Sequence, residues 1–186
     1  MSVSLPDLID PRKAVAQSTR FAGELCLANL KRLSPLLFRG EGGDNSVTGS
    51  ARYRLEFGRD GDGRSVVSGN VVAELPLCCQ RCFDRYVLAV DVPVSLALVG
   101  GLDEANRLPE QYDPLLMEDR LLRSSNLIED ELILAIPSIP RHPHGSCQPP
   151  EPSQAPGASG SSDHLGDETN PFAVLGSLKA GRDDNN

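Results

Sequence analysis

Three stretches of the chain alternate hydrophobic and polar residues with a period of two, as strands with one buried and one exposed face do. They cover residues 47–57, 67–77 and 86–99. The glycine- and aspartate-rich connection 58–63 can supply the positive φ values that a hairpin turn requires. We therefore predict an antiparallel meander over residues 47–99.

Two prolines interrupt this pattern, Pro76 in the second stretch and Pro93 in the third. Because proline has no N–H group to donate to a strand ladder, each should lie at an edge, at a bulge or on a side facing solvent.

Helical patterns precede the meander. Asp10 followed by Pro11 is typical of an N-capped helix start, and we expect that helix to end by Gly23. A second, short helix is predicted over residues 27–33, stopped by Pro35.

Another helix is predicted after the meander and an acidic, proline-containing connection. From about Leu121 to Ile136, apolar residues recur at offsets of three and four, and residues 129–131, all acidic, are interpreted as its exposed face. Pro137 and Pro140 should end this helix. The expected fold class is α+β, with the meander covered by helices from both ends of the domain.

The C-terminal part has a different composition. We assign residues 1–144 to the folded domain and expect a disordered linker over residues 145–169, which are rich in Pro, Ser, Gly and acidic residues. A short helical peptide is predicted over residues 170–179, followed by a disordered tail, 180–186. Its apolar residues at helical spacing either pack back on the domain or bind a partner: Phe172, Leu175 and Leu178.

Composition and charge narrow the class of protein. The chain has 186 residues and a net charge of -8, but residues 1–40 carry six basic and three acidic side chains, and residues 100–140 carry three basic and nine acidic ones. An acidic surface disfavours broad nucleic-acid binding and leaves only a local contact through the basic N-terminal part. No run approaches the roughly 18 apolar residues of a membrane span, so we expect a cytosolic protein.

The candidate chemistry lies between the second and third predicted strands, in the sequence Cys79-Gln80-Arg81-Cys82. Two thiols at this spacing on a hairpin tip can bind one metal ion, and zinc then needs two further ligands to complete a tetrahedron. His142 and Cys147 are the candidates, with His144 as the alternative. Two other interpretations are open: small hydrophobic residues at a strand end, and reduced thiols without a metal.

Other chemistry is less well supported by the sequence. A reactive dithiol usually begins a helix, whereas this pair lies between strands with only Arg81 and Arg85 as nearby cations. Cys78 should point to the opposite side of the strand, and Cys26 is interpreted as a core or surface thiol. The sequence has neither a Gly-x-Ser-x-Gly turn nor a phosphate-binding Gly-x-x-x-x-Gly-Lys loop. We therefore expect no enzymatic activity.

Four stretches of the chain resemble the YceD family, bacterial and plastid proteins called large ribosomal RNA subunit accumulation proteins. They are residues 77–82, 129–137, 142–147 and 170–179. Many relatives carry a richer cysteine cluster after the second of these stretches, completing a four-thiolate site. In this chain that half consists of His142, His144 and Cys147.

The resemblance implies a ribosome-assembly factor that supports synthesis, processing or stability of 23S ribosomal RNA. It implies no catalytic residues. The expected partner is a ribosomal protein or a pre-ribosomal particle, with no binding to membrane or DNA, and direct RNA contact is left open. We expect the acidic segment 103–131 to meet a basic ribosomal protein. A metal- or redox-responsive regulator that uses Cys79 and Cys82 is the alternative, and an RNA-modifying or RNA-cleaving enzyme ranks third.

Overall fold

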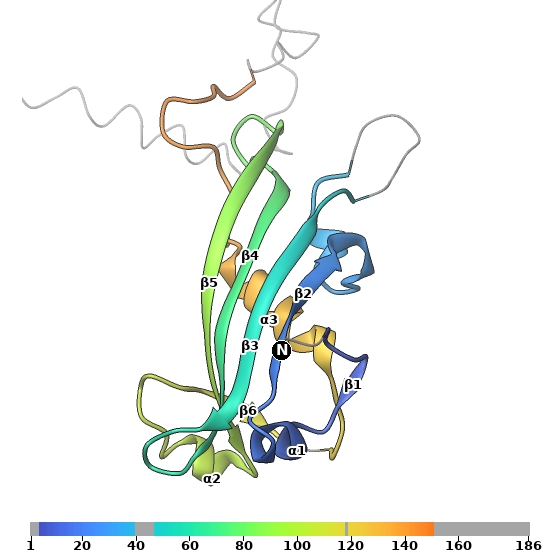
Figure 1. The fold of residues 1–186 in the computed structure, drawn as a ribbon. Helices are drawn as coiled ribbons and strands as arrows, with labels where there is room; N and C mark the ends of the chain where they lie inside the picture. Colours follow the sequence, from blue (N-terminus) through green and yellow to red (C-terminus); the bar gives the residue numbers. More distant parts are fainter. Residues whose placement is uncertain (1–3, 40–46, 118, 151–186) are drawn as a thin grey trace, which may run out of the picture. The chain divides into compact units, whose positions relative to one another are not determined.

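A five-stranded sheet in the order β2-β3-β4-β5-β6 is the framework of the protein (Figure 1). The computed structural model describes residues 4–39, 47–117 and 119–150. In chain order, the elements are β1 (Leu8–Ile9), α1 (Pro11–Ala16), β2 (Arg20–Cys26), the 3₁₀ turns η1 (Leu27–Asn29) and η2 (Ser34–Leu36), β3 (Ser50–Arg59), β4 (Ser65–Cys78), β5 (Arg85–Val99), α2 (Leu102–Ala105), β6 (Asp113–Leu116), β7 (Leu122–Arg123) and α3 (Ser124–Ala135).

The predicted meander is confirmed. β3, β4 and β5 are consecutive antiparallel neighbours, and the register pairs Phe57 with Val67 and Val67 with Leu96. All three side chains are buried on the face that carries the core. The alternating pattern identified these strands because each has one dry face and one wet face.

Both proline predictions hold as well. Pro76 lies beyond the last β3–β4 pair, Ala51 with Ala73, so the β3 side of β4 has no strand to bond at that point. Pro93 pairs with Asn70 of β4, and β6 joins the other side of β5 only from Leu96 onward. The other side of β5 at Pro93 therefore has no strand to bond.

The helices predicted before the meander are largely wrong. α1 begins after the Asp10 cap as expected, but it ends at Ala16, and Arg20–Cys26 forms the edge strand β2. Phe21 is buried there and meets the ring of Phe57 edge-on, with centroids 5.6 Å apart. Sheet pairing and this aromatic contact outweigh the weak local helical tendency.

The short helix predicted over residues 27–33 is reduced to the single turn η1. Pro35 does not stop a helix but lies inside the second turn, η2. Leu27, Leu30 and Leu33 are all buried, so the apolar spacing was identified correctly while the backbone between them is irregular.

The acidic connection after the meander contains two elements that the pattern did not predict. These are the short helix α2 and the strand β6, which pairs in parallel with β5. Helix α3 also starts three residues later than expected, because Leu122–Arg123 instead forms β7 and pairs with β1.

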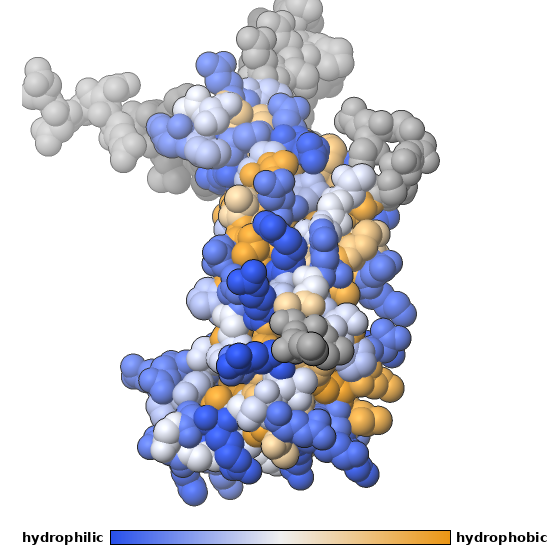
Figure 2. Space-filling view, in the orientation of Figure 1, coloured by the Kyte–Doolittle hydropathy of each residue, from blue (hydrophilic) through white to orange (hydrophobic). Residues whose placement is uncertain are grey.

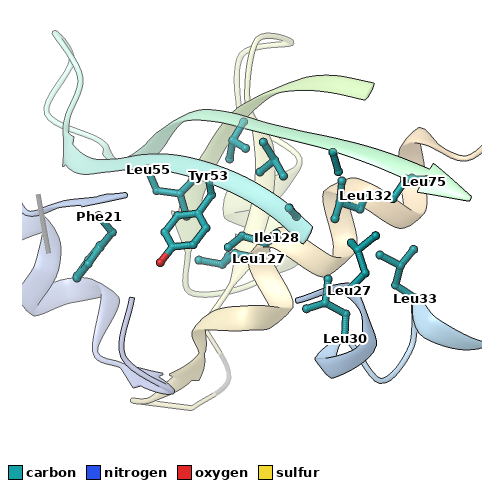
Figure 3. Close-up of a cluster of buried hydrophobic side chains, with 14 of the residues drawn as sticks. Phe21, Leu27, Leu30, Leu33, Tyr53, Leu55, Leu75, Leu127, Ile128 and Leu132 are labelled. Atoms are coloured by element: carbon teal, nitrogen blue, oxygen red, sulfur yellow. The ribbon is translucent and has the colours of Figure 1, made fainter. Parts of the chain in front are cut away.

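α1 packs against β3 and β4, and α3 packs against β4 and β5, so helices from both ends of the domain cover the sheet, as expected. Leucine and isoleucine side chains from α3 interdigitate with those from the sheet and from η1 (Figure 3). On the outer surface, hydrophilic residues cover most of the face in view, and hydrophobic ones form small separate patches (Figure 2).

Glu129 contradicts the interpretation of residues 129–131 as a wholly exposed helix face. Glu129 is only 3% exposed. Its Oε1 accepts hydrogen bonds from the backbone N–H groups of Arg32 (2.6 Å) and Leu33 (3.0 Å). The Arg32 Nε also lies 3.3 Å from its Oε2. Asp130 is exposed, as predicted, and pairs with the same arginine. Glu129 therefore ties α3 to the loop between η1 and η2.

Two further predictions concern the C-terminal part of the chain and the membrane. Outside the described residues lie the linker 145–169 beyond residue 150, the peptide 170–179 and the tail 180–186. Within the described ranges, no helix is both long and apolar enough to cross a bilayer.

Replacing Glu129 with Ala should lower the free energy of unfolding by about 3 kcal/mol, because one buried and one partly buried N–H group lose their acceptor. The control Asp130→Ala removes only an exposed charge and should cost less than about 1 kcal/mol. Urea denaturation of the two variants measures the difference. Equal effects of the two substitutions would contradict this role of Glu129.

Candidate metal centre

The turn between β4 and β5 is closed by backbone hydrogen bonds. The Cys79 N–H donates to the Asp84 carbonyl at 2.9 Å, and the Phe83 N–H donates to the Cys79 carbonyl at 2.9 Å. Phe83 has a φ of 65°, in the left-handed region that favours glycine. The turn therefore holds both cysteines of the Cys-x-x-Cys motif on one tight loop.

The segment that follows α3 is held against this turn. The Gln80 N–H donates to the Pro140 carbonyl at 2.8 Å, and the Arg81 guanidinium donates to the Pro143 carbonyl at 3.3 Å. Figure 1 shows this segment, in orange, beside the hairpin tip. These contacts bring together two parts of the chain that are about 60 residues apart in sequence.

Packing of His142 strengthens the contact. Its ring lies 5.1 Å from that of Tyr86 between centroids, and its backbone N–H points at the Cys79 Sγ at 3.5 Å. The ring packing and the backbone hydrogen bond together hold His142 beside the turn.

The structure brings together four of the predicted ligands: Cys79, Cys82, His142 and Cys147. Their ligand atoms all lie within 4.8 Å of one another. His144, the alternative ligand, is exposed and is not a member of this group.

The spacing of these atoms suits a tetrahedral ion. The Sγ atoms of Cys79 and Cys147 are 3.8 Å apart, and the Cys82 Sγ is 3.4 Å from the His142 Nδ1. With metal–sulfur bonds of about 2.3 Å and metal–nitrogen bonds of about 2.0 Å, the corresponding edges of a tetrahedron are about 3.8 Å and about 3.5 Å. We name this group the Cys₃His cluster.

The environment of the cluster shifts the pKa values of the two thiols of the motif in opposite directions. Burial by itself raises the pKa of Cys79, but N–H groups of Cys82, His142 and Arg81 donate to its sulfur and lower the pKa to about 5. Burial, together with the neighbouring thiols of Cys147 and Cys79, raises the pKa of Cys82 to about 12. One thiolate is therefore stabilised by the fold alone, and a bound cation would favour loss of the other thiol protons.

Arg81 is a supporting residue that the sequence indicated only as a nearby cation. Its Nε donates to the Cys147 Sγ at 3.1 Å, and its backbone N–H donates to the Cys79 Sγ at 3.4 Å. One arginine therefore connects both halves of the cluster, and its charge offsets that of the thiolates. The Cys-x-x-Cys pattern alone does not predict this contact.

The remaining cysteines lie outside the cluster. The Cys78 Sγ points to the Phe83 carbonyl at 3.3 Å and is not a member of the cluster, and Cys26 is exposed. Cys79 is fully buried, with 0% exposure, which disfavours attack on an external substrate. The geometry thus suits a metal ligand better than a redox nucleophile.

Comparison with known proteins identifies a family and a relative that spans nearly the whole chain. The sequence model of the family described as "Large ribosomal RNA subunit accumulation protein YceD" matches residues 67–179. The chain is 31% identical over 178 residues to a protein of that name from Haemophilus influenzae, which covers 95% of this chain and 97% of the relative. No solved structure matches the chain.

The lowered pKa of Cys79 links folding to pH in the metal-free protein. Because the pKa falls from 9.0 to about 5 on folding, the stabilisation is complete above pH 9 and is lost as the pH falls to about 5. Metal-free protein should therefore become less stable over this interval, and Cys79→Ser should remove that part of the pH dependence. Cys82, whose pKa is raised from 9.0 to about 12, lowers the stability only as the pH rises above about 9.

Denaturation with urea at a series of pH values, in the presence of a chelator and a reductant, measures this dependence. Cys26→Ser, which changes an exposed thiol, is the matched control and should keep the full slope. The same slope in Cys79→Ser as in the control would show that the thiolate does not stabilise the fold.

Proposed function

Because the chain belongs to the YceD family, we propose that it is a non-enzymatic ribosome-assembly factor that supports synthesis, processing or stability of 23S ribosomal RNA. The observation that carries this proposal is the agreement between the family match, which starts in β4 and runs to residue 179, and the relative that covers nearly the whole chain. Both bear a name that refers to accumulation of the large ribosomal RNA subunit.

We further propose that the Cys₃His cluster binds zinc as a structural ion. Three thiolates and one imidazole form a ligand set typical of structural zinc sites. Such sites are closed by four protein ligands, whereas catalytic zinc sites keep one position open for water or substrate. A closed site favours a non-enzymatic role, in which zinc fastens the segment after α3 to the hairpin tip.

The proposed partner is a basic ribosomal protein or a pre-ribosomal particle. Within the acidic segment, Glu129 faces the interior and Asp130 pairs with Arg32, so neither is free to meet a partner. The exposed acids lie on and around α2 and β6: Asp103, Glu104, Glu110, Asp113 and Asp119. We propose that this acidic end binds a cationic protein and keeps it in place until RNA replaces it.

A redox-responsive regulator is less well supported. The Sγ atoms of Cys79 and Cys147 lie 3.8 Å apart, which is a contact distance and well beyond the roughly 2.05 Å of a disulfide. Burial of Cys79 also limits access by an oxidant.

Protein purified without a chelator should contain about one zinc ion per chain, and Cys79→Ser combined with Cys82→Ser should contain almost none. Elemental analysis measures both. Cys78→Ser combined with Cys26→Ser changes two thiols outside the cluster and should keep the metal. A zinc content near zero in the unmutated protein ends the zinc proposal.

Deletion of the gene should produce a deficit of large ribosomal subunits in sucrose gradients, and the protein should sediment with large-subunit precursors at low salt. Asp103→Lys combined with Glu110→Lys should weaken that association, because the acidic end then repels a cationic partner. Glu74→Lys, an exposed acid on the sheet, is the control. A normal subunit profile in the deletion strain would contradict the proposed function.

A further inference from the structure

An aromatic side chain is held in solvent at the hairpin tip. Phe83 is 61% exposed, and its φ of 65° places it in a conformation that bulky residues rarely adopt. Glycine would fit the same backbone without steric cost. The chain thus has a large apolar ring at a position where neither core packing nor backbone geometry calls for one.

Two separate segments each place an exposed arginine at this turn. Arg85 begins β5 and is exposed, and Arg141 is exposed on the segment that follows α3. Neither forms a salt bridge within the described part of the chain. Asp84 is the one acidic residue between positions 79 and 85.

The fold fixes Arg141 beside the tip through both of its neighbours. The Pro140 carbonyl accepts from the Gln80 N–H at 2.8 Å, and the His142 N–H donates to the Cys79 Sγ at 3.5 Å. The backbone of Arg141 is therefore pinned across the turn that carries Phe83.

We propose that Phe83, Arg85 and Arg141 form a contact surface for single-stranded RNA. In this arrangement a base stacks on the exposed ring of Phe83, and the two guanidinium groups neutralise neighbouring phosphates. The inference deepens the proposed function and rests on it, since it gives the assembly factor a direct contact with ribosomal RNA.

Charge distribution favours RNA over a protein at this surface. The exposed acids around α2 and β6 lie at the opposite end of the β4–β5 hairpin (Figure 1), and β5, with 15 residues, spans about 45 Å between the two ends. At α2, Arg64 and Arg107 lie beside Asp103 and Glu104, so cations and carboxylates are mixed there. The tip carries exposed Arg85 and Arg141 with Asp84 as its one acidic neighbour, which attracts phosphate. Among the residues that the structure describes, the tip alone combines exposed cations with an exposed aromatic ring, which together suit nucleotides.

Fluorescence anisotropy with zinc-loaded full-length protein and a labelled oligouridylate tests the stacking contact. Phe83→Gly should weaken binding by about tenfold or more, while its melting temperature stays the same or rises because glycine accepts the positive φ. Phe83→Trp should retain the affinity of the unmutated protein. The same oligouridylate paired with oligoadenylate should bind more weakly, since its bases are already stacked.

The two arginines should contribute to the dependence of RNA affinity on salt concentration. Arg85→Ala and Arg141→Ala should each reduce the magnitude of the negative slope of log affinity against log salt by about 0.7. Arg107→Ala, which removes an exposed cation near α2, is the matched control and should leave the slope unchanged.

Equal binding of oligouridylate by Phe83→Gly and by the unmutated protein would overturn the inference. The inference would also be overturned if Phe83→Gly bound oligouridylate normally but no longer captured a ribosomal protein. The surface would then belong to a protein partner. A deletion strain with normal ribosomal subunits would remove the proposed function alone, and the anisotropy result would still decide whether the tip binds RNA.

Discussion

The capture of the segment after α3 by the β4–β5 hairpin tip is the constraint on which the functional part of the molecule depends. Two hydrogen bonds to carbonyl groups, from the Gln80 N–H and the Arg81 guanidinium, hold residues 140–143 against the turn. This contact places His142 and Cys147 beside Cys79 and Cys82. Without it the two thiols of the hairpin would be a pair with no third or fourth ligand, and Arg141 would have no fixed position.

Helix α3 makes this capture possible because it is fixed at more than one point. Leu127, Ile128 and Leu132 pack into the core, and Glu129 anchors the helix to the loop after η1. The direction of α3 across the sheet then sets where its C-terminal extension emerges. The same long hairpin separates the tip that carries Arg85 and Arg141 from the exposed acids around α2 and β6.

Sequence patterns identified the features with strong periodicity and missed those that depend on distant contacts. The meander was predictable from strict alternation, and the four cluster residues from their ligand chemistry. β2 was mistaken for helix because its burial is set by pairing with β3, and the inward position of Glu129 depends on N–H groups 97 and 96 residues away. Arg81 as a supporting residue and Phe83 with its positive φ became apparent only once the turn geometry was known.

X-ray absorption at the zinc edge of the purified protein tests the central claim most directly, because it counts the atoms bound to the ion. The account predicts three sulfur ligands at about 2.3 Å and one nitrogen at about 2.0 Å, with the nitrogen replaced in His142→Ala. A site with only two sulfur ligands, or an unchanged spectrum in His142→Ala, would contradict the joining of the hairpin tip to the segment after α3.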